Sequence, residues 1–174
     1  MKEEINSKFM TYFRIGILIW ILVANSILHI MEFEYGWLIF IGNIFFFTLP
    51  GDDTKKKLAT VTFGGLVGIL ITYVLLFLIV ALSPIVGEFL GFMIPLALGM
   101  IILINCHPLA PTFFNNVGFA YLICCTMDIE KFASNFLMYV LTFLIGGLIF
   151  NLGCIAMMKP CMKLASKKAS IAKV

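Results

Sequence analysis

Long apolar runs alternate with short charged segments along this chain, and the alternation limits its fold more than any other feature. Six runs cover most of the sequence: 13–31, 37–50, 58–82, 86–106, 113–126 and 132–158. Hydrophobic residues make up 62% of the 174 residues and charged residues 12%, with a mean hydropathy of +1.10. Soluble domains carry roughly a quarter charged residues. The composition therefore predicts an integral membrane protein whose main partner is the lipid bilayer.

The lengths of the runs predict which of them are long enough to cross the membrane as helices. A transmembrane helix needs about 20 apolar residues, and four of the runs reach that length. The runs 37–50 and 113–126 are near 14 residues, or about 21 Å as helix. A backbone in lipid must bond to itself, and the runs lack the alternation of barrel strands. We therefore predict an all-α fold, a polytopic transmembrane helix bundle with about six membrane segments.

The lysine and arginine residues predict the orientation of the chain. With a cytoplasmic amino terminus and six crossings, Lys131 is the one member of the 12 that falls on the outer side. Basic residues in short loops favour the cytoplasmic face, so both termini are predicted to be cytoplasmic. We expect a cytoplasmic segment at 1–12, a bundle at 13–158 and a basic tail at 159–174. The tail is expected either on the anionic inner leaflet or in solvent.

The two halves of the bundle, 13–82 and 86–158, repeat one design. Each has a long helix, a short aromatic helix, a charged turn and a second long helix. One register pairs the first short helix with the second as Trp37, Phe40 and Gly42 with Pro111, Phe114 and Asn116. Another pairs Phe40, Asn43 and Phe46 with Phe113, Asn116 and Phe119, and the sequence does not decide between them. Three crossings in each half make the two repeats inverted.

Two further features recur in both halves. Charged turns follow the short helices at 52–55 and 128–131, and a Gly-Gly-Leu triplet follows at 64–66 and 146–148.

Glycines spaced by four also predict close helix contacts, because small residues let backbones approach in lipid. One such line joins Gly64 and Gly68, and a longer one runs from Gly87 through Gly91 and Pro95 to Gly99.

The paired short helices also predict a place for a solute path. Short or interrupted segments in two inverted halves point to a substrate site near the midplane. We therefore select as candidate path-lining residues Trp37, Phe40, Asn43, Phe114, Asn116 and Tyr121. Packing with interhelical hydrogen bonds is the other explanation of the two asparagines. No Asp, Glu, Lys or Arg lies in the middle of a run, which disfavours a proton relay and favours passive conduction of a small neutral or weakly charged solute.

The same motifs give the chain a resemblance to a known family. They comprise Trp37, Phe40, Gly42, Phe47 and Pro50 with a lysine in the following turn, and then Pro111, Phe114 and Tyr121. On these residues the chain, over about 35–158, resembles the small bacterial inner-membrane proteins of domain of unknown function 1097. The family carries glycine where this chain has Asn116. The resemblance implies a multi-pass protein of the bacterial cytoplasmic membrane, and it brings no activity and no functional residues.

Other functional classes find little support in the sequence. It has no nucleophile-elbow motif, phosphate-cradling loop or zinc signature, so we expect no enzyme, cofactor or metal. Its five cysteines read as packed thiols, and an intramembrane enzyme using Cys124 or Cys125 is a distant option. The excess lysine flanks membrane segments, so no nucleic acid is expected. A non-transporting accessory or assembly subunit is the alternative to transport, and a thin bundle leaves homo-oligomerisation open.

Overall fold

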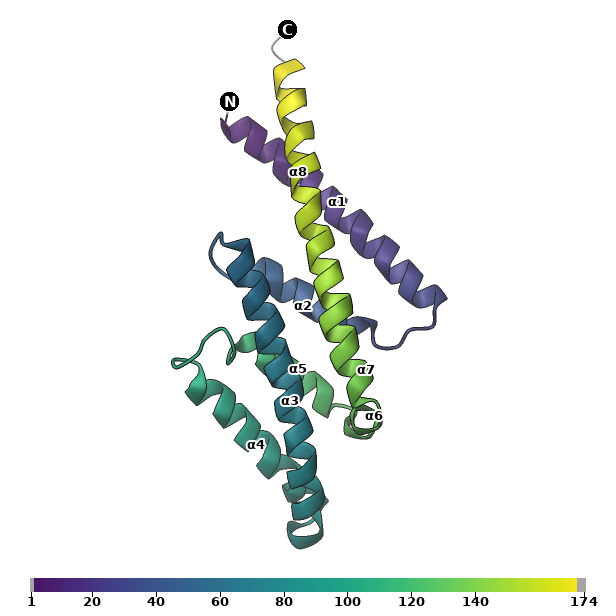
Figure 1. Cartoon of the computed structure of the whole chain (residues 1–174), viewed down its shortest axis with the longest axis vertical. Helices are drawn as coiled ribbons and strands as arrows, with labels where there is room; N and C mark the ends of the chain where they lie inside the picture. The colour runs from purple at the N-terminus through teal and green to yellow at the C-terminus, as the bar shows by residue number, and fades with distance from the viewer. Residues whose placement is uncertain (1, 172–174) are drawn as a thin grey trace. The chain divides into compact units, whose positions relative to one another are not determined.

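The computed structural model describes residues 2–171, and every regular element in that range is helical (Figure 1). The elements are α1 (Lys2–Ile30), α2 (Gly36–Thr48), α3 (Thr54–Val86), α4 (Glu88–Cys106), α5 (Asn116–Thr126), α6 (Ile129–Ser134), α7 (Phe136–Leu141), the π-helix η1 (Thr142–Gly146) and α8 (Gly147–Ile171). The predicted all-α class is confirmed.

Four helical stretches are long and apolar enough to cross a membrane. They are Ile5–Ile30, Thr54–Val86, Glu88–Cys106 and Phe136–Lys168, and the shorter apolar helices are α2 and α5. Large apolar side chains on these stretches are exposed, as with Val80 at 72% and Phe89 at 74%. Lipid is the solvent that accommodates such side chains. The protein is therefore an integral membrane protein, and the predicted division into four long and two short helices is confirmed.

The sixth apolar run begins later in the structure than in the sequence prediction. The run was expected from Phe132, but Phe132 lies in the short α6, and the chain leaves the helical conformation at Asn135 (φ −127°, ψ 24°). The Asn135 side chain donates a hydrogen bond to the Lys131 carbonyl oxygen at 3.0 Å. Asparagine competes in this way with helical backbone bonds, so the last long helix begins at Phe136.

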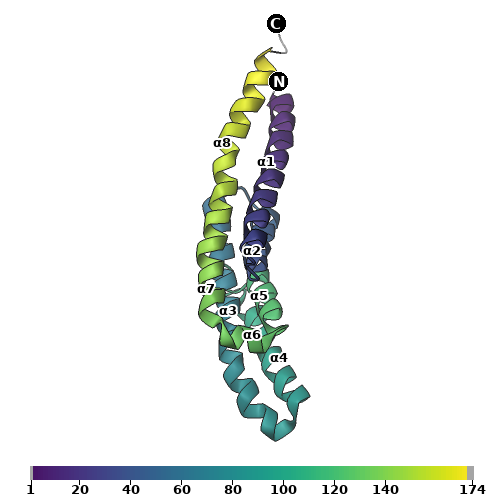
Figure 2. The same cartoon turned by 90° about the vertical axis from the view of Figure 1, so that its right-hand side faces the viewer.

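Contacts divide the chain into two compact units, Met1–Gly36 with Ile149–Val174 and Trp37–Leu148. This division does not follow the predicted halves 13–82 and 86–158. In the second unit α3 is the central helix and contacts α4, α5, α6 and α7. Figures 1 and 2 show α3 and α4 as an antiparallel hairpin.

The helices α3 and α5 touch backbone to backbone. A Cβ atom added to Gly68 would collide with the Gly118 carbonyl, and one added to Gly118 would lie 2.7 Å from the Gly64 carbonyl oxygen. Only glycine allows helices to approach this closely in lipid. The close contact predicted for Gly64 and Gly68 is confirmed.

The longer glycine line on α4 is confirmed over most of its length. A Cβ on Gly91 would lie 2.5 Å from the Ser83 hydroxyl oxygen, and one on Gly99 would lie 2.8 Å from a Leu75 methyl carbon. These two residues therefore bring α4 against α3. Gly87 does not belong to this contact. It ends α3 at a φ of +85°, with open space where a Cβ would be, so its role is the turn.

In the first unit, α1 lies beside the part of α8 after Leu148 (Figure 2). The Trp20 indole donates a hydrogen bond to the Phe150 carbonyl oxygen at 3.3 Å. Further along, an apolar cluster contains Phe9, Phe13, Cys161 and Ala165. The segments expected as a cytoplasmic amino-terminal piece and a basic tail are thus helical from Lys2 and up to Ile171, and they pair with each other.

Candidate functional site

The fully buried Tyr121 of α5 lies at the centre of the second unit, with 0% exposure. Its hydroxyl group donates a hydrogen bond to the Leu38 carbonyl oxygen of α2. Its ring stacks on Trp37 with centroids 6.4 Å apart and meets Phe143 of η1 edge to face at 4.6 Å. We call this group of residues the Tyr121 contact, and it ties together α2, α5 and η1.

Two glycines make room for the Tyr121 contact. A Cβ on Gly42 of α2 would lie 3.0 Å from the Tyr121 hydroxyl oxygen, and one on Gly65 of α3 would lie 2.5 Å from the Phe143 ring. Any larger residue at Gly65 would have to displace an aromatic ring held on several sides. The four helical elements therefore close around Tyr121 without a gap at these positions.

A cavity of about 360 Å³ lies on one side of this contact. We call it the Trp37 cavity, and it is lined by Trp37 and Ile41 of α2, Cys124 of α5, Met127, Asp128, Lys131 and Tyr139 of α7. The Trp37 and Tyr139 rings meet edge to face with centroids 5.9 Å apart. The cavity therefore combines an aromatic wall with a carboxylate and an ammonium group.

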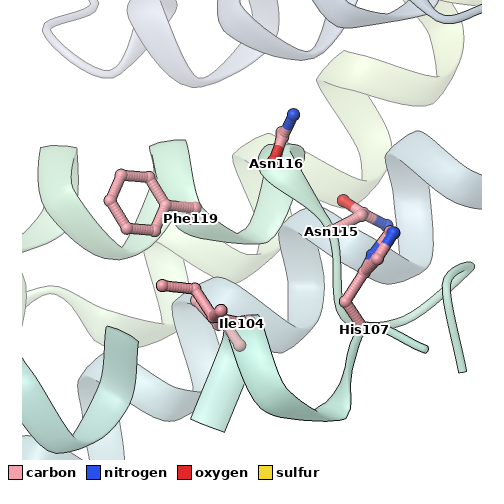
Figure 3. A pocket seen from close by; sticks show the side chains of 6 residues that line it. Ile104, His107, Asn115, Asn116 and Phe119 are labelled. Carbon is pink, nitrogen blue, oxygen red and sulfur yellow. The ribbon is translucent and has the colours of Figure 1, made fainter. Parts of the chain in front are cut away.

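Two cavities lie where the α2–α3 turn meets the α4–α5 loop. The larger, of about 540 Å³, is lined by Leu49, Pro50, Gly51, Asp52, Asp53, Lys56, Lys57, Thr60, His107, Pro111, Thr112, Asn115 and Asn116. The smaller, of about 230 Å³, is lined by Leu103, Ile104, His107, Asn115, Asn116 and Phe119 (Figure 3). Because His107, Asn115 and Asn116 line both, we treat them together as the Asn116 cavities.

Asn115 fixes the loop that forms the Asn116 cavities. Its side-chain oxygen accepts hydrogen bonds from the backbone N–H groups of Val117 at 2.9 Å and Gly118 at 3.3 Å, which caps α5 at its amino end. Its side-chain nitrogen donates to the carbonyl oxygens of Pro111 and Thr112, both at 3.0 Å. Asn115 is thus a structural residue at the edge of the cavities.

His107 fixes the other end of the same loop. Its Nδ1 atom lies 2.6 Å from the Phe114 carbonyl oxygen. A carbonyl oxygen only accepts, so Nδ1 carries the hydrogen and donates it. The Nε2 atom is then the one that acts as an acceptor when the ring is neutral. His107 therefore both closes the loop and brings a polar ring to the two cavities.

The structure brings some of the predicted path-lining residues together and separates others. Trp37 and Tyr121 stack on each other, and Asn116 lines the Asn116 cavities. Asn43 is buried at 5% exposure in the middle of α2, whereas Asn116 is exposed and is the first residue of α5. The two asparagines thus occupy different positions in their helices. Four of the six predicted residues lie outside the linings of these cavities: Phe40, Asn43, Phe114 and Tyr121.

The cavities also contain charged and polar residues that were not among the predicted path-lining residues: Asp52, Asp53, Lys56, Lys57, His107, Asp128, Lys131 and Tyr139. Four of them belong to the charged turns at 52–55 and 128–131, so the repeat of these turns was the available signal. Within the described range, no group of three or more His, Cys, Asp or Glu side chains is placed to hold a metal ion.

A scan against family models and searches of the curated proteins and of the solved structures return no match to this chain. Its function is therefore argued from the geometry of the Tyr121 contact and the cavities beside it.

Proposed function

We propose that the chain crosses the membrane six times, as two inverted repeats whose middle helices are α2 and α5. The Asn116 cavities support this proposal because they join two segments predicted on the inner side, the α2–α3 turn and the α4–α5 loop. The Trp37 cavity joins two parts predicted on the outer side, the start of α2 and the turn after α5. The two short helices then run in opposite directions between the same two ends.

On this topology the protein is a small transporter or channel for a small neutral or weakly charged solute. The observation that carries the proposal is that cavities lie at both ends of the short-helix pair and the Tyr121 contact lies between them. With 13 residues in α2 and 11 in α5, these helices are about 20 and 17 Å long. A hydrocarbon core is about 30 Å thick. The barrier at the Tyr121 contact is therefore thinner than the bilayer.

The location follows from the same topology and from the family resemblance. Both termini face the cytoplasm, and the membrane is the bacterial cytoplasmic membrane. The resemblance to domain of unknown function 1097 contributes the membrane alone, since it brings no activity.

A second candidate function is a non-transporting accessory subunit. It is favoured by the closed interior of the second unit, where Val61, Val117 and Leu122 are buried at 2%, 0% and 0% exposure. A bundle whose centre stays closed conducts no solute. Its function would instead be to offer a rigid binding surface to a partner protein. This function predicts that crosslinking and purification recover one partner in a fixed ratio.

Reconstitution into liposomes separates the two candidates. We expect liposomes with the protein to swell faster than empty liposomes for at least one solute in a panel of small polar molecules. Asn116→Leu should slow that swelling, because it removes an amide from the cavity lining. Asn105→Leu is the matched control, since Asn105 lies outside the cavity linings and bonds to the Ile101 carbonyl of its own helix at 2.9 Å.

If liposomes with the protein swell no faster than empty liposomes for any solute, and purification recovers a partner in a fixed ratio, transport is rejected and the accessory subunit is supported.

A further inference from the structure

Both cavity systems are lined by acidic and basic residues together. Asp128 and Lys131 line the Trp37 cavity, and Asp52, Asp53, Lys56 and Lys57 line the larger Asn116 cavity. Asp52, Asp53, Asp128 and Lys131 come from the two charged turns that the sequence repeats, and Lys56 and Lys57 follow the first of these turns. An uncharged solute needs neither sign of charge, and a simple ion would meet one attractive and one repulsive group. A solute that carries both charges would find a partner for each.

The acidic residues hold fixed positions because they cap helices. An oxygen of Asp128 accepts a hydrogen bond from the Lys131 backbone N–H at 3.2 Å. An oxygen of Asp53 accepts from the backbone N–H groups of Lys55 at 2.9 Å and Lys56 at 3.2 Å. A capping carboxylate is held at the first turn of its helix. Each cavity therefore has one negative charge whose place the backbone determines.

The Trp37 cavity adds an aromatic wall to this charge pattern. The Trp37 and Tyr139 rings meet edge to face at 5.9 Å, and Ile41 and Cys124 line the same space. Aromatic faces attract ammonium groups, and the aliphatic lining accepts a short apolar group. A volume of about 360 Å³ lies at the small end of the usual range for ligand pockets, so it suits a solute of amino-acid size.

We propose that the Trp37 cavity binds a small zwitterion with an ammonium group, a carboxylate and a short aliphatic side chain. The ammonium group lies by Asp128 and the aromatic rings, the carboxylate by Lys131, and the aliphatic part against Ile41. The solute has no net charge, which agrees with the absence of Asp, Glu, Lys and Arg from the middle of the apolar runs. As a statement about substrate class, this inference rests on the proposed transport function. As a statement about binding, it is tested separately.

The native thiol of Cys124 reports on occupancy of the cavity. Cys124 lines the cavity and is half-buried, whereas the adjacent Cys125 is buried at 1% exposure. The full-length protein in proteoliposomes is treated with a charged, membrane-impermeant thiol reagent, and tandem mass spectrometry follows each cysteine. A bound solute excludes the reagent, so L-leucine at about ten times its Kd should slow modification of Cys124 about tenfold by mass action.

A matched set of probes resolves which charges are needed. L-leucine carries both charges, 3-methylbutylamine only the ammonium, 4-methylpentanoate only the carboxylate, and 4-methylpentanamide neither. We expect protection by L-leucine and at least tenfold higher concentrations for the same protection by each of the others. Equal protection by the amine, the carboxylate or the amide overturns the zwitterion assignment.

Substitutions then assign the negative partner. Asp128→Asn keeps a side-chain oxygen that caps α6 and removes the charge, so protection by L-leucine should be lost. Glu130→Gln removes an exposed charge from α6 outside the cavity lining and should leave protection unchanged. Protection that survives Asp128→Asn overturns the proposal, as does a Cys124 thiol that reacts no faster than Cys125 or that no probe protects.

Failure of this site and failure of transport give different results. Protection of Cys124 without flux of any solute in the same vesicles keeps the zwitterion site and rejects the transporter. Flux without protection keeps the transporter and rejects the site.

Discussion

At the scale of single residues, Tyr121 is the side chain that joins the two short helices. Its hydroxyl bonds to the Leu38 carbonyl, and its ring lies against Trp37 and Phe143. The hydroxyl joins α5 to α2, whereas the ring fills space. The two contributions separate when the hydroxyl alone is removed.

We predict that Tyr121→Phe lowers the free energy of unfolding by about 1 kcal/mol, the usual net contribution of one buried hydrogen bond. The weaker tie between α2 and α5 should also speed solute flux in proteoliposomes. Denaturant unfolding of the protein in mixed micelles measures the first effect. Tyr73→Phe is the control. It also removes one tyrosine hydroxyl, and it leaves the Tyr73 ring stacked on Phe136 with the ring centroids 4.0 Å apart. Equal destabilisation by both changes would argue against a special role for the Tyr121 hydroxyl.

Two adjacent asparagines have different roles and give a second prediction. Asn115→Ala removes the cap of α5 and should lower the free energy of unfolding by about 1–2 kcal/mol. Asn116→Ala, on an exposed side chain, should change it by less than about 0.5 kcal/mol. Unfolding in mixed micelles compares the two. A larger loss from Asn116→Ala than from Asn115→Ala would contradict the assignment of the cap.

The sequence singled out Asn116 because it recurs with Asn43, and of the two only Asn116 lines one of the cavities described above. An Asn-Asn pair before an apolar run contains a capping residue, but the pattern does not say which of the two it is. That choice depends on the loop held by His107, whose bond to Phe114 joins residues seven apart. The charged turns at 52–55 and 128–131 were visible as a repeat, but their place beside the cavities depends on tertiary contacts.

At the scale of helices, α3 and α5 cross in backbone contact. Gly68 meets the backbone of Gly118 with no room for a Cβ. Gly147, the first residue of α8, is less constrained, because a Cβ there would lie 4.0 Å from the Phe143 ring. Glycine-to-alanine substitution at Gly68 and at Gly147 therefore compares a backbone contact with an ordinary van der Waals contact.

We predict that Gly68→Ala is destabilising by about 1–3 kcal/mol or more, because the added methyl group must push two helix backbones apart. Gly147→Ala should be neutral or stabilising by up to about 1 kcal/mol, since alanine is the better helix former. Unfolding in mixed micelles measures both. A neutral Gly68→Ala would show that α3 and α5 are not in backbone contact.

Run length and glycine spacing predicted most of the helices and the α3–α5 contact. They did not predict the break at Asn135, the π-helix η1 or the pairing of α1 with the carboxyl-terminal part of α8. Hydropathy is averaged over about twenty residues. A single asparagine such as Asn135, which breaks the helix, therefore leaves the average apolar, and the run appears continuous. By its sequence alone, the lysine-rich end of α8 is typical of a solvated tail. The structure shows that its apolar side, with Cys161 and Ala165, packs against Phe9 and Phe13.

At the scale of the whole molecule, the proposed transport function requires both short helices to cross the membrane. If α2 and α5 cross, the turn before α3 and the turn before α6 lie on opposite sides of the bilayer. If neither crosses, the four long helices alone set the topology, and both turns lie on the same side. The lysine distribution favours the first arrangement, and the two cavity systems agree with it.

The most direct test is the sidedness of the two charged turns. Lys56→Cys and Glu130→Cys, both at exposed positions, are made separately and treated in intact cells with a membrane-impermeant maleimide, with the parent protein as the background for native thiols. We predict that the reagent labels Glu130→Cys from outside and labels Lys56→Cys only after the membrane is opened. Labelling of both from the same side would contradict the inverted repeat, and the proposed solute path would fail with it.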